Sequence, residues 1–214
     1  RVTGCCHLLF AMIKTRKGDH IMKKEVLVFI FDGYADWEIA YICAELMEAG
    51  HDHVIRTISA DGQPKTSMGG LRVAADYSLA EPPEAFSMLI LPGGMAWLTQ
   101  ANDHVLPLVG YALRHDILVG AICNACNFMA ENGYLDTRRH TGNTLAFMQS
   151  QSPHYHGEKL FVERQAVYDQ GVITANGSAA LEFAREILLL LKAKPADEIS
   201  AWYRLNKDGF YAAQ

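Results

Sequence analysis

The most constraining feature of this sequence is an alternation of short apolar runs with segments whose apolar residues repeat at helical spacing. The first run, Glu25–Phe31, is almost continuously apolar, as expected of a strand that is buried on both faces. Further strands are predicted at His53–Ser59, Met88–Leu91 and Leu118–Ile122. Helices are predicted at about Asp36–Ala49 (ended by Gly50), Asp103–His115, Asn124–Asn132, Ala180–Lys192 and Ala196–Lys207. Such alternation predicts an α/β fold, a mostly parallel sheet with helices on both faces.

Three segments depart from this alternation. Residues 61–81 contain Gly69-Gly70 and short polar pieces, which predict a small hairpin outside the main sheet. Phe161–Tyr168 and Gly171–Ala175 are predicted as two strands joined by a tight turn. Residues 1–21 place basic residues after an apolar run, unlike a signal peptide, and we interpret them as an N-terminal extension. The domain is therefore expected to span residues 22–214.

Composition narrows the classes of function. Half of the 214 residues are hydrophobic and a fifth are charged, which excludes a disordered chain. The net charge of −5 lacks the basic excess typical of nucleic-acid binders, and the longest apolar runs are too short to span a membrane. Five cysteines, an odd number, favour a reducing compartment. We therefore expect a cytoplasmic protein that binds neither nucleic acid nor membrane.

Chemically distinctive residues follow three of the predicted strands. In parallel sheets, ligands bind beyond the carboxyl ends of the strands. Glu38 follows the first strand, Gly93 and Gly94 follow the third, and Cys123 follows the fourth. A cysteine at the start of a helix is expected to have a lowered pKa, because the helix N-terminus stabilises a thiolate. The backbone N–H groups of the glycines and of Asn124 could then form an oxyanion hole.

Five motifs in order, VLVFIFDGYADWE, LILPGG, VGAICNAC, RRHTGN and VITANGSAALEFAREIL, resemble the DJ-1/PfpI superfamily over about Lys24 to Leu191. The resemblance is greatest to a bacterial branch described as intracellular proteases or amidases. It implies a flavodoxin-like three-layer sandwich, shared with class I glutamine amidotransferases and usually found as a homodimer.

The resemblance also implies roles for individual residues. Cys123 matches the reactive cysteine, Glu38 matches the acidic residue that hydrogen-bonds to it, and His140 falls where some members place a histidine facing the cysteine. Because a carboxylate and a thiolate repel, we expect a protonated Glu38 that donates to the sulfur.

Two departures from the family pattern affect the expected activity. Members credited with peptidase activity carry histidine directly after the cysteine, where this chain has Asn124. The amidotransferases use a histidine near the C-terminus, and this chain has none after His156. Both established triads are thus incomplete.

Three functions remain open at this point. The first is a hydrolase for a small-molecule or peptide substrate, with Cys123 as nucleophile, Glu38 as proton partner and His140 as general base. The second is a redox-sensing or protective stress protein, of deglycase or glyoxalase type, in which Cys123 oxidises to a sulfinic acid. The third is a non-catalytic dimeric binding module. The sequence implies no cofactor or metal; Cys126 could form a dithiol with Cys123 but is more simply interpreted as a buried residue.

Overall fold

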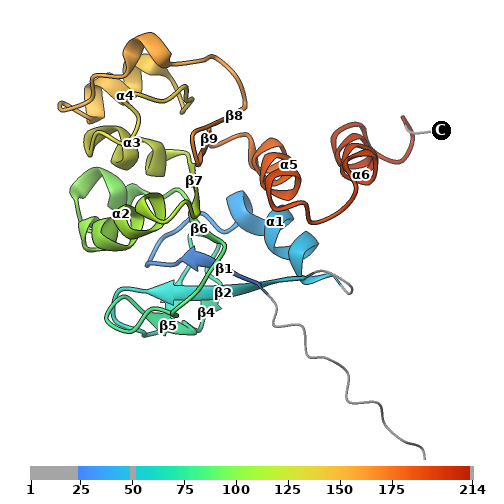
Figure 1. The fold of residues 1–214 in the computed structure, drawn as a ribbon, viewed down its shortest axis with the longest axis horizontal. Coiled ribbons are helices and arrows are strands. Elements are labelled where there is room, and N and C mark those ends of the chain that lie inside the picture. The colour runs from blue at the N-terminus through green and yellow to red at the C-terminus, as the bar shows by residue number, and fades with distance from the viewer. Residues whose placement is uncertain (1–23, 49–51, 213–214) are drawn as a thin grey trace, which may run out of the picture.

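The computed structural model describes residues 24–48 and 52–212. Its centre is a seven-stranded sheet with the strand order β5-β2-β1-β6-β7-β9-β8 (Figure 1). The strands of this sheet are β1 (Lys24–Phe29), β2 (His53–Ser59), β5 (Tyr77–Ser78), β6 (Met88–Leu91), β7 (Leu118–Ile122), β8 (Ala166–Asp169) and β9 (Val172–Ala175). All neighbouring strands are parallel except β8 and β9, which are antiparallel.

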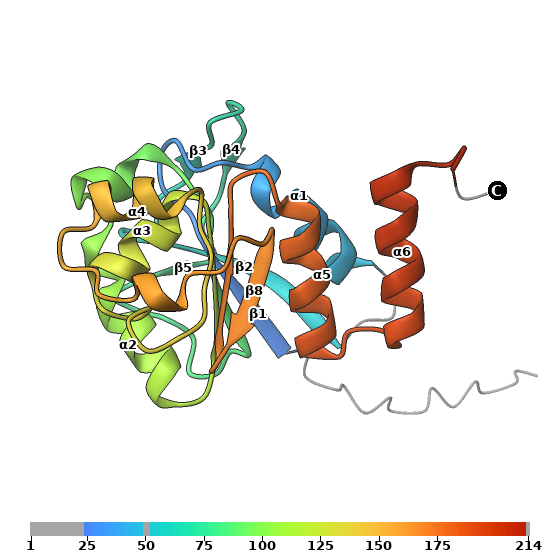
Figure 2. The same cartoon turned by 90° about the horizontal axis from the view of Figure 1, so that it is seen from above.

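Helices cover both faces of the sheet. The α-helices are α1 (Trp37–Met47), α2 (Leu106–Arg114), α3 (Asn124–Glu131), α4 (Leu145–Gln151), α5 (Ala180–Leu191) and α6 (Ala196–Asp208). Short 3-10 helices are η1 (Met95–Thr99), η2 (Asp103–Val105) and η3 (Glu158–Leu160). Figure 2 shows α1 and α5 on one face, with α6 packed outside α5, and α2, α3 and α4 on the other. The predicted fold class, a mostly parallel α/β sandwich, is confirmed.

The central strands are almost wholly apolar because they are buried in the core on both faces of the sheet. Every residue of β6 is buried, and so are the last four residues of β1 and of β7, because helices lie against both sides of these strands. Gly120 of β7 illustrates how close the packing is. A Cβ at this position would lie 2.8 Å from a ring carbon of Phe183 on α5, so only glycine lets that ring lie on the strand.

Two predicted segments differ from the structure. The expected hairpin is present as β3 (Lys65–Thr66) and β4 (Arg72–Val73), but β5 from the same segment joins the edge of the main sheet. Thr57 of β2 holds that edge, because its backbone N–H donates to the carboxylate of Asp76 at 2.7 Å. The strand expected to start at Phe161 begins only at Ala166, since Phe161 forms an isolated bridge with His140.

Two predictions lie outside the described residues: the extension at residues 1–21 and the helix end at Gly50. No helix in the described part of the chain combines the length and the apolar character needed to cross a bilayer.

Candidate active site

Cys123 occupies a strained turn between β7 and α3. Its backbone has φ 60° and ψ −127°, a left-handed conformation that non-glycine residues rarely adopt. The turn is fixed on both sides: the Cys123 N–H donates to Ala175 O at 2.9 Å, and the Cys123 carbonyl accepts from Cys126 N at 3.0 Å. Strain of this kind typically costs about 1–3 kcal/mol and is found mainly at functional sites. The turn leaves the side chain half-buried at the carboxyl end of the sheet.

Glu38 lies in the first turn of α1, with a side chain that is only 1% exposed. Its Oε2 atom accepts the backbone N–H of Gly93 at 2.6 Å, and its carboxylate also shares a hydrogen bond with the Cys123 thiol. A Cβ at Gly93 would lie 2.5 Å from Glu38 Oε2 and 2.6 Å from Cys123 Cβ. The three residues can therefore meet only because position 93 is glycine.

Two asparagines complete the surroundings of the sulfur. Asn143 Nδ2 donates to Cys123 Sγ at 3.5 Å and to Asn124 Oδ1 at 3.4 Å. The Oδ1 atom of Asn143 accepts the Gly177 N–H at 2.9 Å, which fixes the orientation of the amide. On the other side, Asn124 Nδ2 donates to Gly94 O at 3.3 Å, and the Asn124 backbone N–H donates to the sulfur. Two neutral donors, Asn143 Nδ2 and the Asn124 backbone N–H, therefore point toward the sulfur, where negative charge would form.

Near neutral pH the Cys123 thiol keeps its proton, and Glu38 changes between its protonated and its charged form. Burial raises the pKa of Glu38 to about 7, although the donors Gly93 N–H and Cys123 oppose this rise. Burial and, after it, the Glu38 charge together raise the pKa of Cys123 to about 11, although hydrogen bonds from Asn143 and Asn124 oppose this rise. The expected lowering of the thiol pKa is therefore wrong: the effects of burial and of Glu38 exceed that of the helix N-terminus. When Glu38 is charged, the thiol donates to its carboxylate, the reverse of the expected direction.

The structure brings five of the six predicted site residues together: Cys123, Glu38, Gly93, Gly94 and Asn124. Gly93 differs from the expected oxyanion donor, because its N–H is already bonded to Glu38.

His140, the sixth, is fully buried in a different environment. Its Nδ1 lies 2.6 Å from Arg138 O and its Nε2 lies 2.6 Å from the hydroxyl of Tyr155. Burial lowers the pKa of His140, which keeps the ring neutral. With both ring nitrogens engaged in this way, the geometry does not support His140 as a general base for Cys123.

Asn143 and Gly177 also belong to the site, although the sequence did not predict them as site residues. Both lie within motifs that carry the family resemblance, RRHTGN and ANGSAALEF, but neither is a residue type that draws attention in a search for acids, bases or nucleophiles. A Cβ at Gly177 would lie 2.9 Å from Cys123 Sγ, so this glycine keeps the space beside the sulfur open.

Cys126 lies beneath the turn and faces inward. It is fully buried, and its sulfur lies 3.3 Å from Ala175 O and 3.4 Å from Ala121 O. Burial raises its pKa, which makes it a poor partner for thiol exchange. In the described ranges, no group of three or more His, Cys, Asp or Glu side chains is placed to hold a metal ion.

The fold and this site together define a class: an α/β sandwich protein with a cysteine on the turn that follows a central parallel strand. The profile of the DJ-1/PfpI family matches residues 24–190, and the chain belongs to that family.

Individual relatives and a solved structure point the same way. The chain is 36% identical to the "Uncharacterized protease YoaZ" of Bacillus subtilis, over 86% of this chain and 91% of the relative. It is 35% identical to the "Uncharacterized protease YdeA" of the same organism, over 88% and 93%. A solved ThiJ/PfpI family protein from Bacillus anthracis superposes with a TM-score of 0.80 at 38% identity, covering 86% of this chain and 91% of that one.

Proposed function

We propose that this protein is a cysteine-dependent hydrolase that cleaves amide bonds of small molecules or peptides through Cys123. The observation that carries the proposal is the contact between Cys123, on its strained turn, and the buried Glu38. A carboxylate with a pKa of about 7 is well matched to move a proton at neutral pH. The names of the two Bacillus subtilis relatives, both given as proteases, support the same class of reaction.

The first chemical step transfers the thiol proton to Glu38 as the sulfur attacks the substrate carbonyl carbon. A C–S bond forms, and the carbonyl π electrons move to oxygen. We assign the Asn143 amide and the Asn124 backbone N–H, which both donate to the sulfur, together with the Gly94 N–H, as the donors to this oxyanion. This arrangement needs no histidine, because Glu38 alone holds the proton.

The second step releases the amine and then the acid. Glu38 returns its proton to the leaving nitrogen, the C–N bond breaks and a thioester on Cys123 remains. Water then attacks the thioester, giving one proton to Glu38. The C–S bond breaks and the thiolate takes that proton back, which restores the starting state.

The test compares Cys123→Ser with the matched variant Cys43→Ser. Cys43 is a partly buried thiol on α1 whose pKa burial raises to about 12, so its replacement should leave turnover unchanged. On a panel of peptides and aminoacyl amides, Cys123→Ser should fall to the rate of the buffer, because a serine hydroxyl is far less acidic than a thiol. Equal turnover by the wild type and Cys123→Ser would refute the proposal.

A redox-sensing function is the second candidate, and one observation favours it. Three groups can donate hydrogen bonds to an oxidised sulfur here: protonated Glu38, the Asn143 amide and the Asn124 N–H. If this function holds, limited peroxide should add two oxygen atoms to Cys123 before any other cysteine, as seen by peptide mass mapping. Turnover on no substrate together with this oxidation would favour the sensor over the hydrolase.

A further inference from the structure

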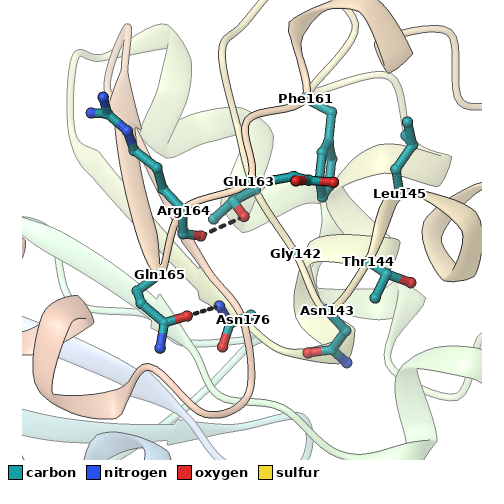
Figure 3. Close-up of a pocket in the computed structure, with 10 residues that line it drawn as sticks. Gly142, Asn143, Thr144, Leu145, Phe161, Glu163, Arg164, Gln165 and Asn176 are labelled. Carbon is teal, nitrogen blue, oxygen red and sulfur yellow. Dashed lines mark hydrogen bonds between the residues drawn. The ribbon is translucent and has the colours of Figure 1, made fainter.

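A pocket of about 400 Å³ lies between residues 141–145, residues 161–165 and Asn176 (Figure 3). Its lining residues are Thr141, Gly142, Asn143, Thr144, Leu145, Phe161, Glu163, Arg164, Gln165 and Asn176. Asn143 belongs both to this pocket and to the surroundings of Cys123, because its Nδ2 lies 3.5 Å from the sulfur. Asn176 precedes Gly177, the glycine that keeps the space beside the sulfur open. A substrate whose carbonyl lies over Cys123 can therefore place a further group in this pocket.

The amide side chains of the pocket are largely bonded to the protein itself. Asn176 Nδ2 donates to Gln165 Oε1 at 2.6 Å, and Asn176 Oδ1 accepts from the N–H and the hydroxyl of Ser178. The hydroxyl of Thr144 accepts Phe147 N–H at the start of α4, and that of Thr141 donates to Arg164 O. This wall is therefore polar but neutral.

One charged group is available to a ligand in this pocket: the carboxylate of Glu163. Phe161 and Glu163 both line the pocket, and Figure 3 shows the Glu163 side chain extended in the direction of the Phe161 ring. Arg164 contributes the pocket's only cation, and its guanidinium points away from the other labelled side chains. Within residues 24–48 and 52–212, no lysine or arginine forms an ion pair with Glu163.

We propose that this pocket binds a positively charged group of the substrate, an ammonium or guanidinium, while the carbonyl to be attacked lies over Cys123. The Glu163 carboxylate attracts a cation through its negative charge, and the face of the Phe161 ring attracts a cation through its π electrons. The edge-to-face contact of Phe161 with His140, 5.7 Å between ring centroids, holds that ring in place. The inference rests on the proposed function, since it names the acyl groups that the Cys123 site takes: those with a lysine-like or arginine-like side chain or a free amino group.

The experiment measures alkylation of Cys123 by related chloromethyl ketones that differ in charge. N-acetyl-lysyl and N-acetyl-norleucyl chloromethyl ketones differ by the ammonium group, and unblocked norleucyl chloromethyl ketone carries its ammonium at the α position instead. Each rate is followed by intact mass and divided by the rate of the same reagent with glutathione. The wild type should react about tenfold faster with a cationic reagent than with the neutral one, given the modest strength of each contact. Which cationic reagent is faster assigns the source of the ammonium.

Glu163→Gln should reduce this preference to within about twofold, because only the charge is lost. Glu84→Gln, which removes the same charge from a different pocket, should leave it unchanged. The preference should also shrink in high salt. Equal rates with all reagents in the wild type, or a preference that survives in Glu163→Gln, would overturn the inference and leave the hydrolase proposal intact. No alkylation of Cys123 by any reagent would overturn both.

Discussion

The proton shared by Glu38 and Cys123 controls the chemistry of this site at the scale of single residues. Neither group is exposed enough for water to stabilise two negative charges, so ionisation of one opposes ionisation of the other. The resting site therefore holds a weakly reactive thiol next to a base. The thiolate forms when Glu38 takes the thiol proton. The nucleophile is therefore activated by a group within the site, without transfer of the proton to bulk solvent.

Replacing Glu38 with glutamine should separate thiol reactivity from turnover. Glutamine keeps the shape but carries no charge, so the thiol pKa should fall. Alkylation of Cys123 by iodoacetamide at pH 8 should become about tenfold faster, since a pKa lower by about one gives tenfold more thiolate. Turnover should fall by roughly 10²-fold or more, because the proton acceptor is lost. Peptide mapping and steady-state kinetics measure the two effects.

Glu182→Gln is the matched control for this variant. Glu182 is also buried, but its carboxylate contacts Tyr203 and Lys207 on α6, away from the sulfur. It should leave Cys123 alkylation unchanged. Slower alkylation in Glu38→Gln would show that the carboxyl supports the thiolate, as first expected, and would contradict the direction argued here.

The site residues that could be predicted from the sequence are those that follow the end of a strand. Cys123 and Glu38 each follow a buried strand closely, so the parallel sheet alone brings them to the same edge. His140 and Asn143 lie three residues apart in one loop, and the path of that loop decides which of the two side chains reaches the sulfur. Two contacts fix the path of this loop: the β-bridge between His140 and Phe161, and the hydrogen bond from Thr141 N to Thr174 Oγ1. Both are tertiary contacts that no local pattern reveals.

At the scale of elements, the strands and helices that the sequence predicts well are the buried and the long ones. The central strands are buried on both faces and the long helices repeat their apolar residues over several turns, so both kinds of element are visible in the sequence. Helix α4 has seven residues, too few for a clear periodicity, although Thr144 caps it by accepting Phe147 N–H at 3.1 Å. Strand β5 has two residues, and its pairing depends on contacts with β2.

The packing of α5 on β7 gives a prediction at this scale. Phe183→Ala removes a fully buried ring that lies over Gly120, and it should lower the free energy of unfolding by about 3–5 kcal/mol. Leu189→Ala, on an exposed position of the same helix, should change it by no more than about 0.5 kcal/mol. Urea unfolding of both variants measures the difference. A loss of similar size in the two variants would contradict the packing described for this helix.

At the scale of the whole molecule, Glu38 makes stability depend on pH. Its pKa rises from an ordinary 4.5 to about 7 in the folded protein, so between these values the folded state holds a proton that the unfolded chain has lost. Stability from this group is fully present below pH 4.5 and decreases as the pH rises through 7, by roughly 3 kcal/mol in all. From pH 5 to pH 8 the free energy of unfolding should thus fall by about 2–3 kcal/mol more in the wild type than in Glu38→Gln. Denaturant titrations at both pH values measure it, and parallel curves for the two proteins would rule out the burial of this proton.

The separate origins of the two reacting groups have a consequence for handling the protein. Glu38 comes from the first strand–helix unit and Cys123 from a later one, with the Gly93 peptide between them. A chain that has lost the first unit through proteolysis, or in which that unit has not packed against the rest, keeps the cysteine without its acidic neighbour. The pH profile of labelling at this one sulfur is therefore a quality assay: a preparation whose Cys123 titrates like a free thiol contains molecules that have not assembled.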